Sequence, residues 1–214
     1  MKQTHVNSYY AATRNFTGDF PVLEELVECD VCVIGAGYTG LSSALFLAEA
    51  GYSVTVLEAA KVGFGASGRN GGQLVNSYSR DVDVIEERYG DKTAEVLGSM
   101  IFEGADIIRQ RIQHYDIQCD YRPGGIFAAM NKKQLKGLAE QKSSWERYGN
   151  KNLKMLDAAD IKREVGSDAY VGGLLDMQGG HIHPLNLALG EASAIIGLGG
   201  KIFEQSAAEE ITYG

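Results

Sequence analysis

No apolar run in the sequence is long enough to cross a lipid bilayer. The stretch 41–50 is apolar over most of its length, but it already contains Glu49. The first 21 residues are polar and lack the hydrophobic core of a secretory signal. We therefore expect no membrane partner and a cytoplasmic location.

Basic residues are too few for a protein whose main partner is nucleic acid. The 214 residues include 20 Lys and Arg against 28 Asp and Glu, a formal net charge of −8. Negative charge repels phosphate backbones and anionic membranes. A composition of 44% apolar and 22% charged residues is ordinary for a globular protein with one sizeable domain or two small ones.

Cysteine is also scarce, and three residues, an odd number, do not make a disulfide framework. Cys29 and Cys32 have the C-x-x-C spacing, but a redox pair of that kind normally opens a helix. These two lie in or before a predicted strand, where positions three apart face opposite ways. We expect buried or partly buried free thiols, and assign no role to Cys119.

The stretch 31–58 organises the chain. An apolar run, Val31–Ile34, predicts a buried parallel strand, and the glycines at 35, 37 and 40 follow it. Gly35 allows the turn, Gly37 leaves room for a pyrophosphate, and Gly40 lets the next helix pack closely. That helix places Leu41, Ala44, Leu45 and Ala48 on one face and ends before Gly51.

A second strand then ends in Glu58, whose carboxylate can accept hydrogen bonds from ribose hydroxyls. The order of strand, glycines, helix, strand and acid predicts a dinucleotide-binding unit rather than an ordinary βαβ unit. The acid at position 58 disfavours a 2′-phosphate, so NADP is the least expected dinucleotide. The fingerprint alone also fits an NAD-dependent dehydrogenase.

A second glycine-rich loop follows at 59–73, where a plain dehydrogenase does not need one. Small residues let the backbone approach a flat ligand or a phosphate. Ser67, Asn70 and Gln73 are candidates for hydrogen bonds to a polar heterocycle, and Arg69 is either a phosphate contact or solvated. We expect ligand contact here rather than a flexible surface loop, because the loop follows directly on the ribose acid.

These motifs resemble the D-amino-acid oxidase/glycine oxidase superfamily of FAD-dependent oxidoreductases. The resemblance rests on the glycines at 35 and 37, the acid at 58, and Gly65-Ala66-Ser67-Gly68-Arg69-Asn70-Gly71-Gly72. The runs Ser8–Thr13 and Leu41–Gly51 extend it to the bacterial gamma-glutamylputrescine oxidases within that superfamily. The resemblance implies an α/β protein with a Rossmann-like FAD-binding βαβ domain and an interleaved α+β substrate region.

The fingerprint and the resemblance together indicate FAD contacts at Gly35, Ala36, Gly37, Tyr38, Thr39, Gly40, Glu58, Ala59, Ala66, Ser67, Asn70, Gly71, Gly72, Gln73 and Ala208. Ala208 stands where relatives often carry valine at a backbone contact to adenine. No catalytic residue is assigned, because the substrate-facing groups vary in this superfamily.

The activity implied is oxidative deamination of an amine, gamma-glutamylputrescine or a related compound. The amine would be oxidised to an imine, which water hydrolyses to an aldehyde and ammonia, while dioxygen accepts the electrons and forms hydrogen peroxide. Two other possibilities stay open: an NAD-dependent dehydrogenase, which the second loop and the arm disfavour, and a catalytically inactive fragment that binds nucleotide.

We divide the chain into an arm at 1–27, a first part of the FAD-binding domain at 28–117, the start of a substrate-binding region at 118–180, and a return to the FAD-binding domain at 181–214. Tyr9, Tyr10, Phe16 and Phe20 predict that the arm lies over the body of the protein. Members of the family are about twice as long as this chain, so we expect a truncated molecule.

Local patterns predict the remaining elements. Residues 81–115 read as two helices broken at Gly90-Asp91, with a core stripe of Ile85, Val96, Leu97, Met100, Ile101, Ile107, Ile108 and Ile112. Pro123-Gly124-Gly125 predicts a turn before a strand at 126–130. We further expect helices at 132–148, after Asp157 and from Pro184, and strands at 170–178, 201–204 and 210–213.

His181 and His183 are two apart, so on a strand they share a face and resemble a metal-binding pair. No third ligand stands nearby in the sequence. We expect structural or solvated histidines rather than ones that face the substrate, and no metal site.

Overall fold

The protein is described by a computed structural model that covers residues 3–78 and 82–212. The chain forms two compact units. Unit 1 comprises the residues up to Gly72, together with Arg111–Asp120 and the residues from Ile182 onward. Unit 2 comprises Gln73–Gln110 and Tyr121–His181. Each unit has its own sheet.

Unit 1 is built on a parallel sheet, as predicted. Its strands are β1 (Val31–Ile34), β2 (Val54–Leu57) and β7 (Lys201–Phe203), in the order β1-β2-β7. Val33 pairs with Val56, and Val56 pairs with Ile202. The carboxyl ends of the three strands therefore meet at one edge, where ligands bind in open α/β sheets.

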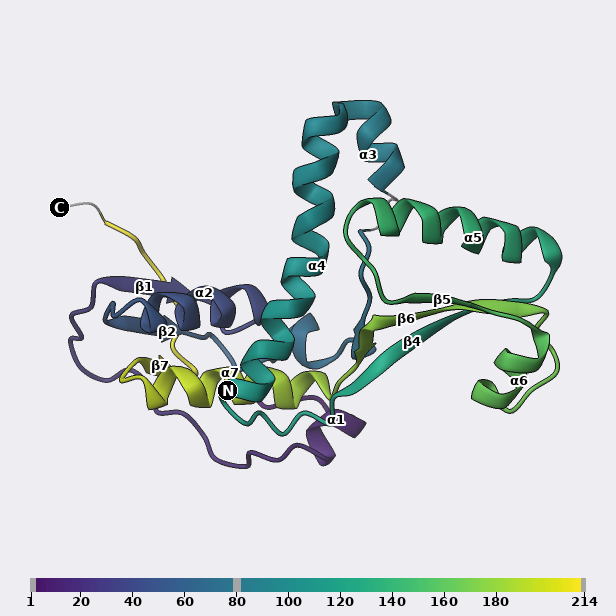
Figure 1. Cartoon of the computed structure of the whole chain (residues 1–214). Coiled ribbons are helices and arrows are strands. Elements are labelled where there is room, and N and C mark those ends of the chain that lie inside the picture. Colours follow the sequence, from purple (N-terminus) through teal and green to yellow (C-terminus); the bar gives the residue numbers. More distant parts are fainter. Residues whose placement is uncertain (1–2, 79–81, 213–214) are drawn as a thin grey trace. The chain divides into compact units, whose positions relative to one another are not determined.

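Two helices, α2 (Tyr38–Glu49) and α7 (Pro184–Gly197), pack together and against this sheet (Figure 1). The predicted helix face is confirmed, because all four of its members are in the buried core: Leu41, Ala44, Leu45 and Ala48. Gly51 follows the end of α2 with φ +88, the left-handed conformation that glycine adopts without strain.

The prediction that β1 is buried was wrong for one of its faces. Cys32 is exposed, and Ile34 has 56% of its surface accessible. The helices cover the face that carries Val33 and Val56, whereas Cys32 and Ile34 alternate to the other face. Cys32 is thus not the buried thiol we expected, while Cys29 is partly buried.

The N-terminal arm lies over the unit 1 core. It contains α1 (Tyr9–Ala12), which begins where the Ser8 side chain accepts a hydrogen bond from the Ala11 N–H. Tyr10, Phe16 and Phe20 pack against the buried core, as predicted. Tyr9 is 73% exposed, so the prediction fails for that ring.

Unit 2 has an antiparallel sheet and most of the remaining helices. Its strands are β3 (Gln73–Leu74), β4 (Arg122–Ala129), β5 (Leu153–Leu156) and β6 (Gly172–His181), and β6 pairs with the other three. Its helices are α3 (Val82–Tyr89), α5 (Lys132–Arg147), α6 (Ala158–Val165) and most of α4 (Asp91–His114), whose last residues belong to unit 1. Asp157 caps α6 through the Asp160 N–H, as expected.

Three local predictions need correction. Pro123-Gly124-Gly125 is not a turn: β4 runs through it with a register shift, and Gly124 takes φ +92. In α4 the buried apolar side chains are those of Ala94, Phe102 and Ala105, whereas Val96 and Met100 are 60% and 52% exposed because they lie on another side of the helix. Residues 210–212 form no strand, and the predicted ends at Asp81 and Tyr213 lie outside the described residues.

Candidate functional site

The glycine turn after β1 brings strand and helix into close contact. Gly35 has φ +100, and its N–H donates to the Leu57 carbonyl at 2.7 Å. A Cβ on Gly40 would lie 1.9 Å from the Gly35 carbonyl oxygen, and one on Gly37 would lie 3.1 Å from Ser67 Oγ. The sequence thus needs glycine at position 40 for packing, and glycine at 37 keeps the backbone open.

The first turn of α2 presents backbone donors. The Tyr38 N–H donates to Ser67 Oγ at 3.0 Å, and Gly37 caps the helix without a side chain. Among residues 3–78 and 82–212, we find no acceptor for the N–H groups of Thr39 and Gly40. Free N–H groups and the positive end of the helix dipole favour a phosphate at this position.

Glu58 lies directly beside this turn. Its Oε2 accepts the Ala36 N–H at 2.8 Å, and its Oε1 accepts the Ala60 N–H at 2.8 Å. A carboxylate has about four acceptor positions, so each oxygen keeps capacity for another donor. The half-buried carboxylate is therefore held in one orientation and can still accept hydrogen bonds from hydroxyl groups.

The second glycine-rich loop is shaped by Asn70. The Asn70 Nδ2 donates to the Ser67 carbonyl at 2.9 Å and to the Ala66 carbonyl at 3.2 Å, and its Oδ1 accepts the Gly72 N–H at 2.8 Å. Gly72 has φ +68, and a Cβ there would lie 2.2 Å from the Ile182 carbonyl oxygen. Asn70 thus closes the loop internally, a role that the sequence did not reveal.

The other predicted contacts of this loop are distributed over both units. Ala66 and Gly71 are exposed in unit 1, as is Ala59 after β2. Gln73 is exposed on β3 of unit 2, opposite His181. Arg69 lies over the Phe64 ring at 5.3 Å and donates to the Gly65 carbonyl. Ala208 is exposed in irregular chain after β7, and its contact to adenine stays a prediction.

Tyr38 and His183 form hydrogen bonds at the first turns of α2 and α7 in unit 1. The Tyr38 hydroxyl donates to the Pro184 carbonyl at 2.9 Å, and burial raises the pKa of Tyr38 to about 12. His183 is 4% exposed and caps α7, because its Nδ1 accepts the Asn186 N–H at 3.1 Å. Burial lowers the pKa of His183, which favours the neutral ring that this cap requires.

The two histidines do not form a pair. His181 ends β6 in unit 2 and is exposed, whereas His183 lies outside the strand and contacts Thr13 Oγ1 at 3.0 Å. The shared face predicted for them was wrong, since the strand ends before His183. In the described part of the chain, no group of three or more His, Cys, Asp and Glu residues is arranged to hold a metal ion.

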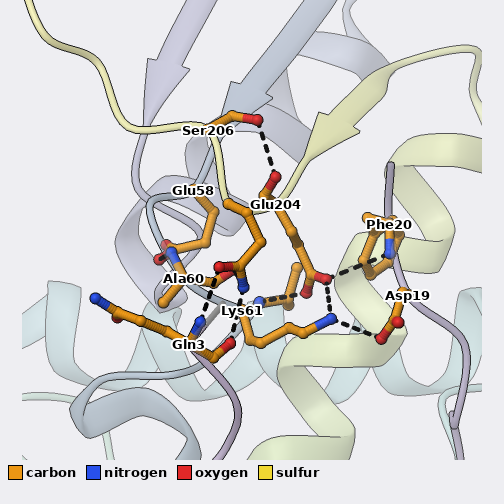
Figure 2. A network of polar contacts seen from close by, with 10 residues as sticks. Gln3, Asp19, Phe20, Glu58, Ala60, Lys61, Glu204 and Ser206 are labelled. Atoms are coloured by element: carbon orange, nitrogen blue, oxygen red, sulfur yellow. Dashed lines mark hydrogen bonds and ion pairs between the residues drawn. The ribbon is translucent and has the colours of Figure 1, made fainter. Parts of the chain in front are cut away.

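Sequence reasoning missed a second acid at the same sheet edge. Glu204 follows β7 as Glu58 follows β2, and the preceding residues Leu57 and Phe203 are register partners. Glu204 is 3% exposed and lies 2.8 Å from Lys61 Nζ (Figure 2). The available signal was its position, an acid directly after a short apolar strand.

No helix within 3–78 and 82–212 combines the length and the apolar character needed to span a membrane. The cytoplasmic location stays a prediction.

Comparison with known proteins identifies relatives along nearly the whole chain. The sequence is 66% identical to gamma-glutamylputrescine oxidoreductase of Escherichia coli over 98% of this chain and 49% of that protein. It is 48% identical to the probable oxidoreductase OrdL of Haemophilus influenzae over 95% of this chain and 48% of that protein. The chain therefore spans about half the length of the curated relatives it matches.

Solved structures share the fold at low sequence identity. An L-amino acid deaminase from Proteus myxofaciens aligns over 100% of this chain and 46% of its own, with TM-score 0.76 and 23% identity. Glycine oxidase from Bacillus cereus aligns over 87% of this chain and 50% of its own, with TM-score 0.65 and 21% identity. The family model described as FAD dependent oxidoreductase matches residues 30–214. The chain accordingly belongs to the FAD-dependent oxidoreductases of the DAO family, as the glycine motifs had predicted.

Proposed function

We propose that this chain binds FAD and serves the oxidative deamination of an amine, gamma-glutamylputrescine or a related compound. The products would be an aldehyde, ammonia and, with dioxygen as electron acceptor, hydrogen peroxide. The 66% identity to gamma-glutamylputrescine oxidoreductase supports this class of substrate. The observation that carries the proposal is the arrangement of the free N–H groups of α2 beside the fixed carboxylate of Glu58.

The residues of unit 1 fit a dinucleotide. Gly37 has no side chain to fill the space toward Ser67, and the Thr39 and Gly40 N–H groups are available to a pyrophosphate. Glu58 is oriented by two backbone N–H groups and keeps acceptor capacity for ribose hydroxyls. We accordingly propose the predicted contacts that lie in unit 1 as the FAD site: Gly35–Gly40, Glu58, Ala59, Ala66, Ser67, Asn70–Gly72 and Ala208. The contact of Gln73, which belongs to unit 2, stays a prediction.

When bound, FAD supplies the electron acceptor for oxidation of the amine. The chain itself contributes binding and orientation: α2 stabilises negative charge, Glu58 fixes the ribose, and Asn70 keeps the second loop in one shape. The division into an arm at 1–27, FAD-binding parts at 28–117 and 181–214, and a substrate region at 118–180 is part of the same proposal.

The proposal is tested by mixing the FAD-loaded protein with gamma-glutamylputrescine in the absence of dioxygen. We expect the visible flavin band to bleach, and faster as the pH rises toward the ionisation of the amine, because the neutral amine is the form that reacts. A derivative acetylated on the amine is the matched control and should leave the band unchanged. Bound FAD that no amine in a wider panel reduces would contradict the proposed function.

A further inference from the structure

Glu58 and Glu204 directly follow the adjacent parallel strands β2 and β7, but the proposed function assigns a role only to Glu58. Glu204 is the more buried of the two, at 3% exposure. A buried carboxylate is costly unless it is paired and hydrogen-bonded. Glu204 is both paired and hydrogen-bonded, so its partners indicate its structural role.

The partners of Glu204 lie on the segment that follows Glu58. Its Oε1 accepts the Val62 N–H at 2.8 Å, and its Oε2 lies 2.8 Å from Lys61 Nζ. Although burial disfavours a charge on Lys61, its hydrogen bonds to Asp19 and Glu204 raise the pKa of that ammonium group. Lys61 thus stays charged, and these contacts fix Lys61 and Val62 to the end of β7.

The same segment holds the carboxylate of Glu58. The Ala60 N–H donates to Glu58 Oε1 at 2.8 Å, while the Ala60 carbonyl accepts from the Gln205 N–H at 3.1 Å. The Ser206 N–H donates to the Glu58 carbonyl at 2.9 Å, and Ser206 Oγ donates to the Glu204 carbonyl at 2.9 Å. In Figure 2 the Glu204 carboxylate meets Lys61 and Ser206 Oγ meets the Glu204 carbonyl, with Glu58 and Ala60 beside them.

We propose that Glu204, with Lys61 as its counter-ion, is a positioning residue for the nucleotide. It fixes residues 60–62, so that the Ala60 N–H holds the Glu58 carboxylate in the orientation that ribose hydroxyls require. This inference rests on the proposed FAD site. Orienting the carboxylate before binding reduces the ordering that the nucleotide must bring about, and so strengthens binding without any contact to the ligand.

The competing explanation is that Glu204 only fastens the N-terminal arm. Its Oε2 also accepts the Phe20 N–H at 3.3 Å, and Lys61 reaches Asp19 on the arm, whose side chain is 79% exposed. In that case Glu204 would support the fold in general, and its loss would weaken binding whether or not Glu58 is present. A double-mutant cycle separates the two explanations.

The probe is ADP, which carries the adenine, ribose and diphosphate, titrated calorimetrically into the wild-type chain, Glu58→Ala, Glu204→Gln and the double variant. We expect Glu58→Ala to weaken binding at least tenfold and Glu204→Gln to weaken it about fivefold. We expect the double variant to bind as weakly as Glu58→Ala alone, because Glu204 acts through Glu58. An equal factor in both backgrounds, or no effect of Glu204→Gln, would overturn the inference.

Asp19→Asn is the matched control, since it removes the other partner of Lys61, and it should leave the affinity for ADP within about twofold. If Glu204→Gln fails to fold, Lys61→Met removes the counter-ion of the same carboxylate and should show the same dependence on Glu58. A wild-type chain that binds neither ADP nor FAD would contradict the proposed function itself. Wild-type affinity in Glu204→Gln would contradict only the positioning role.

Discussion

Replacing Gly40 by alanine is expected to destabilise unit 1 by roughly 3 kcal/mol or more. The added Cβ would lie 1.9 Å from the Gly35 carbonyl oxygen and 3.3 Å from Val33 Cγ1. The nearest obstacle is backbone, which cannot rotate away, so α2 must move from β1. The rate of hydrogen exchange at the α2 and α7 amides measures the loss of stability. Because α2 is displaced, the variant should also bind nucleotide more weakly.

Gly137→Ala is the matched control for this substitution. Gly137 lies inside α5, and its added Cβ would meet no heavy atom within 4 Å. Alanine is the better helix former there, so we expect about 0.5–1 kcal/mol of added stability. Equal protection of α2 in Gly40→Ala and the wild-type chain would show that the turn is not packed as described.

The second large effect concerns the buried pair of Arg111 and Glu191 in unit 1. The two side chains lie 3.1 Å apart, and each is only about one-twentieth exposed. Arg111 also donates to Ser42 Oγ at 2.8 Å and to the Ser42 carbonyl at 3.2 Å. The pair thus connects the end of α4 to α2 and α7.

Burial raises the pKa of Glu191 to about 7, against the opposing influence of Arg111. The unfolded carboxyl group ionises near its ordinary pKa of about 4.5, so between about pH 4.5 and 7 the unfolded state releases its proton before the folded state does. The raised pKa of Glu191 therefore contributes to the free energy of unfolding in full below about pH 4.5, and this contribution is lost as the pH rises through about 7. A shift of this size corresponds to about 3 kcal/mol.

Glu191→Gln removes the titration but keeps the shape of the protonated side chain. We therefore expect the free energy of unfolding of the wild-type chain to fall by about 3 kcal/mol relative to that of this variant between pH 4.5 and 7. Urea denaturation of both proteins across this range measures the difference, in which the other titrating groups cancel. A difference that stays constant, or that moves in favour of the wild-type chain, would contradict the raised pKa.

The parts of the fold that follow from local order were predictable from the sequence. The structure has the elements of 31–58 in the predicted order: strand, glycine turn, helix, second strand and terminal acid. This order was predictable because backbone sterics and periodicity determine each element. The break between α3 and α4 at Gly90 and the cap at Asp157 were predictable for the same reason.

Features that depend on distant neighbours were not predictable. An apolar strand pattern does not say which face the helices will cover, so the exposure of Cys32 and Ile34 was missed. Pro123-Gly124-Gly125 has the composition of a turn, but pairing with β6 extends it into a strand with a register shift. Tertiary pairing overrides the local preference in both cases.

Some residues of the candidate site were likewise predictable from the sequence, and others were not. Gly35, Gly37, Gly40 and Glu58 are recognisable from spacing alone. Asn70 was assigned to a ligand, yet its side chain is occupied by the backbone of its own loop. Glu204 is far from Glu58 in the sequence, and only the register of β2 and β7 brings the two acids to neighbouring strand ends.

The most direct test of this account is a titration of the purified chain with FAD, followed by removal of free cofactor and a visible absorption spectrum. The account predicts retained flavin approaching one FAD per chain, and a large loss of retention in Glu58→Ala. A colourless protein after the same treatment, or equal retention by the Glu58→Ala variant, would contradict the claim that the glycine turn and Glu58 form the dinucleotide site.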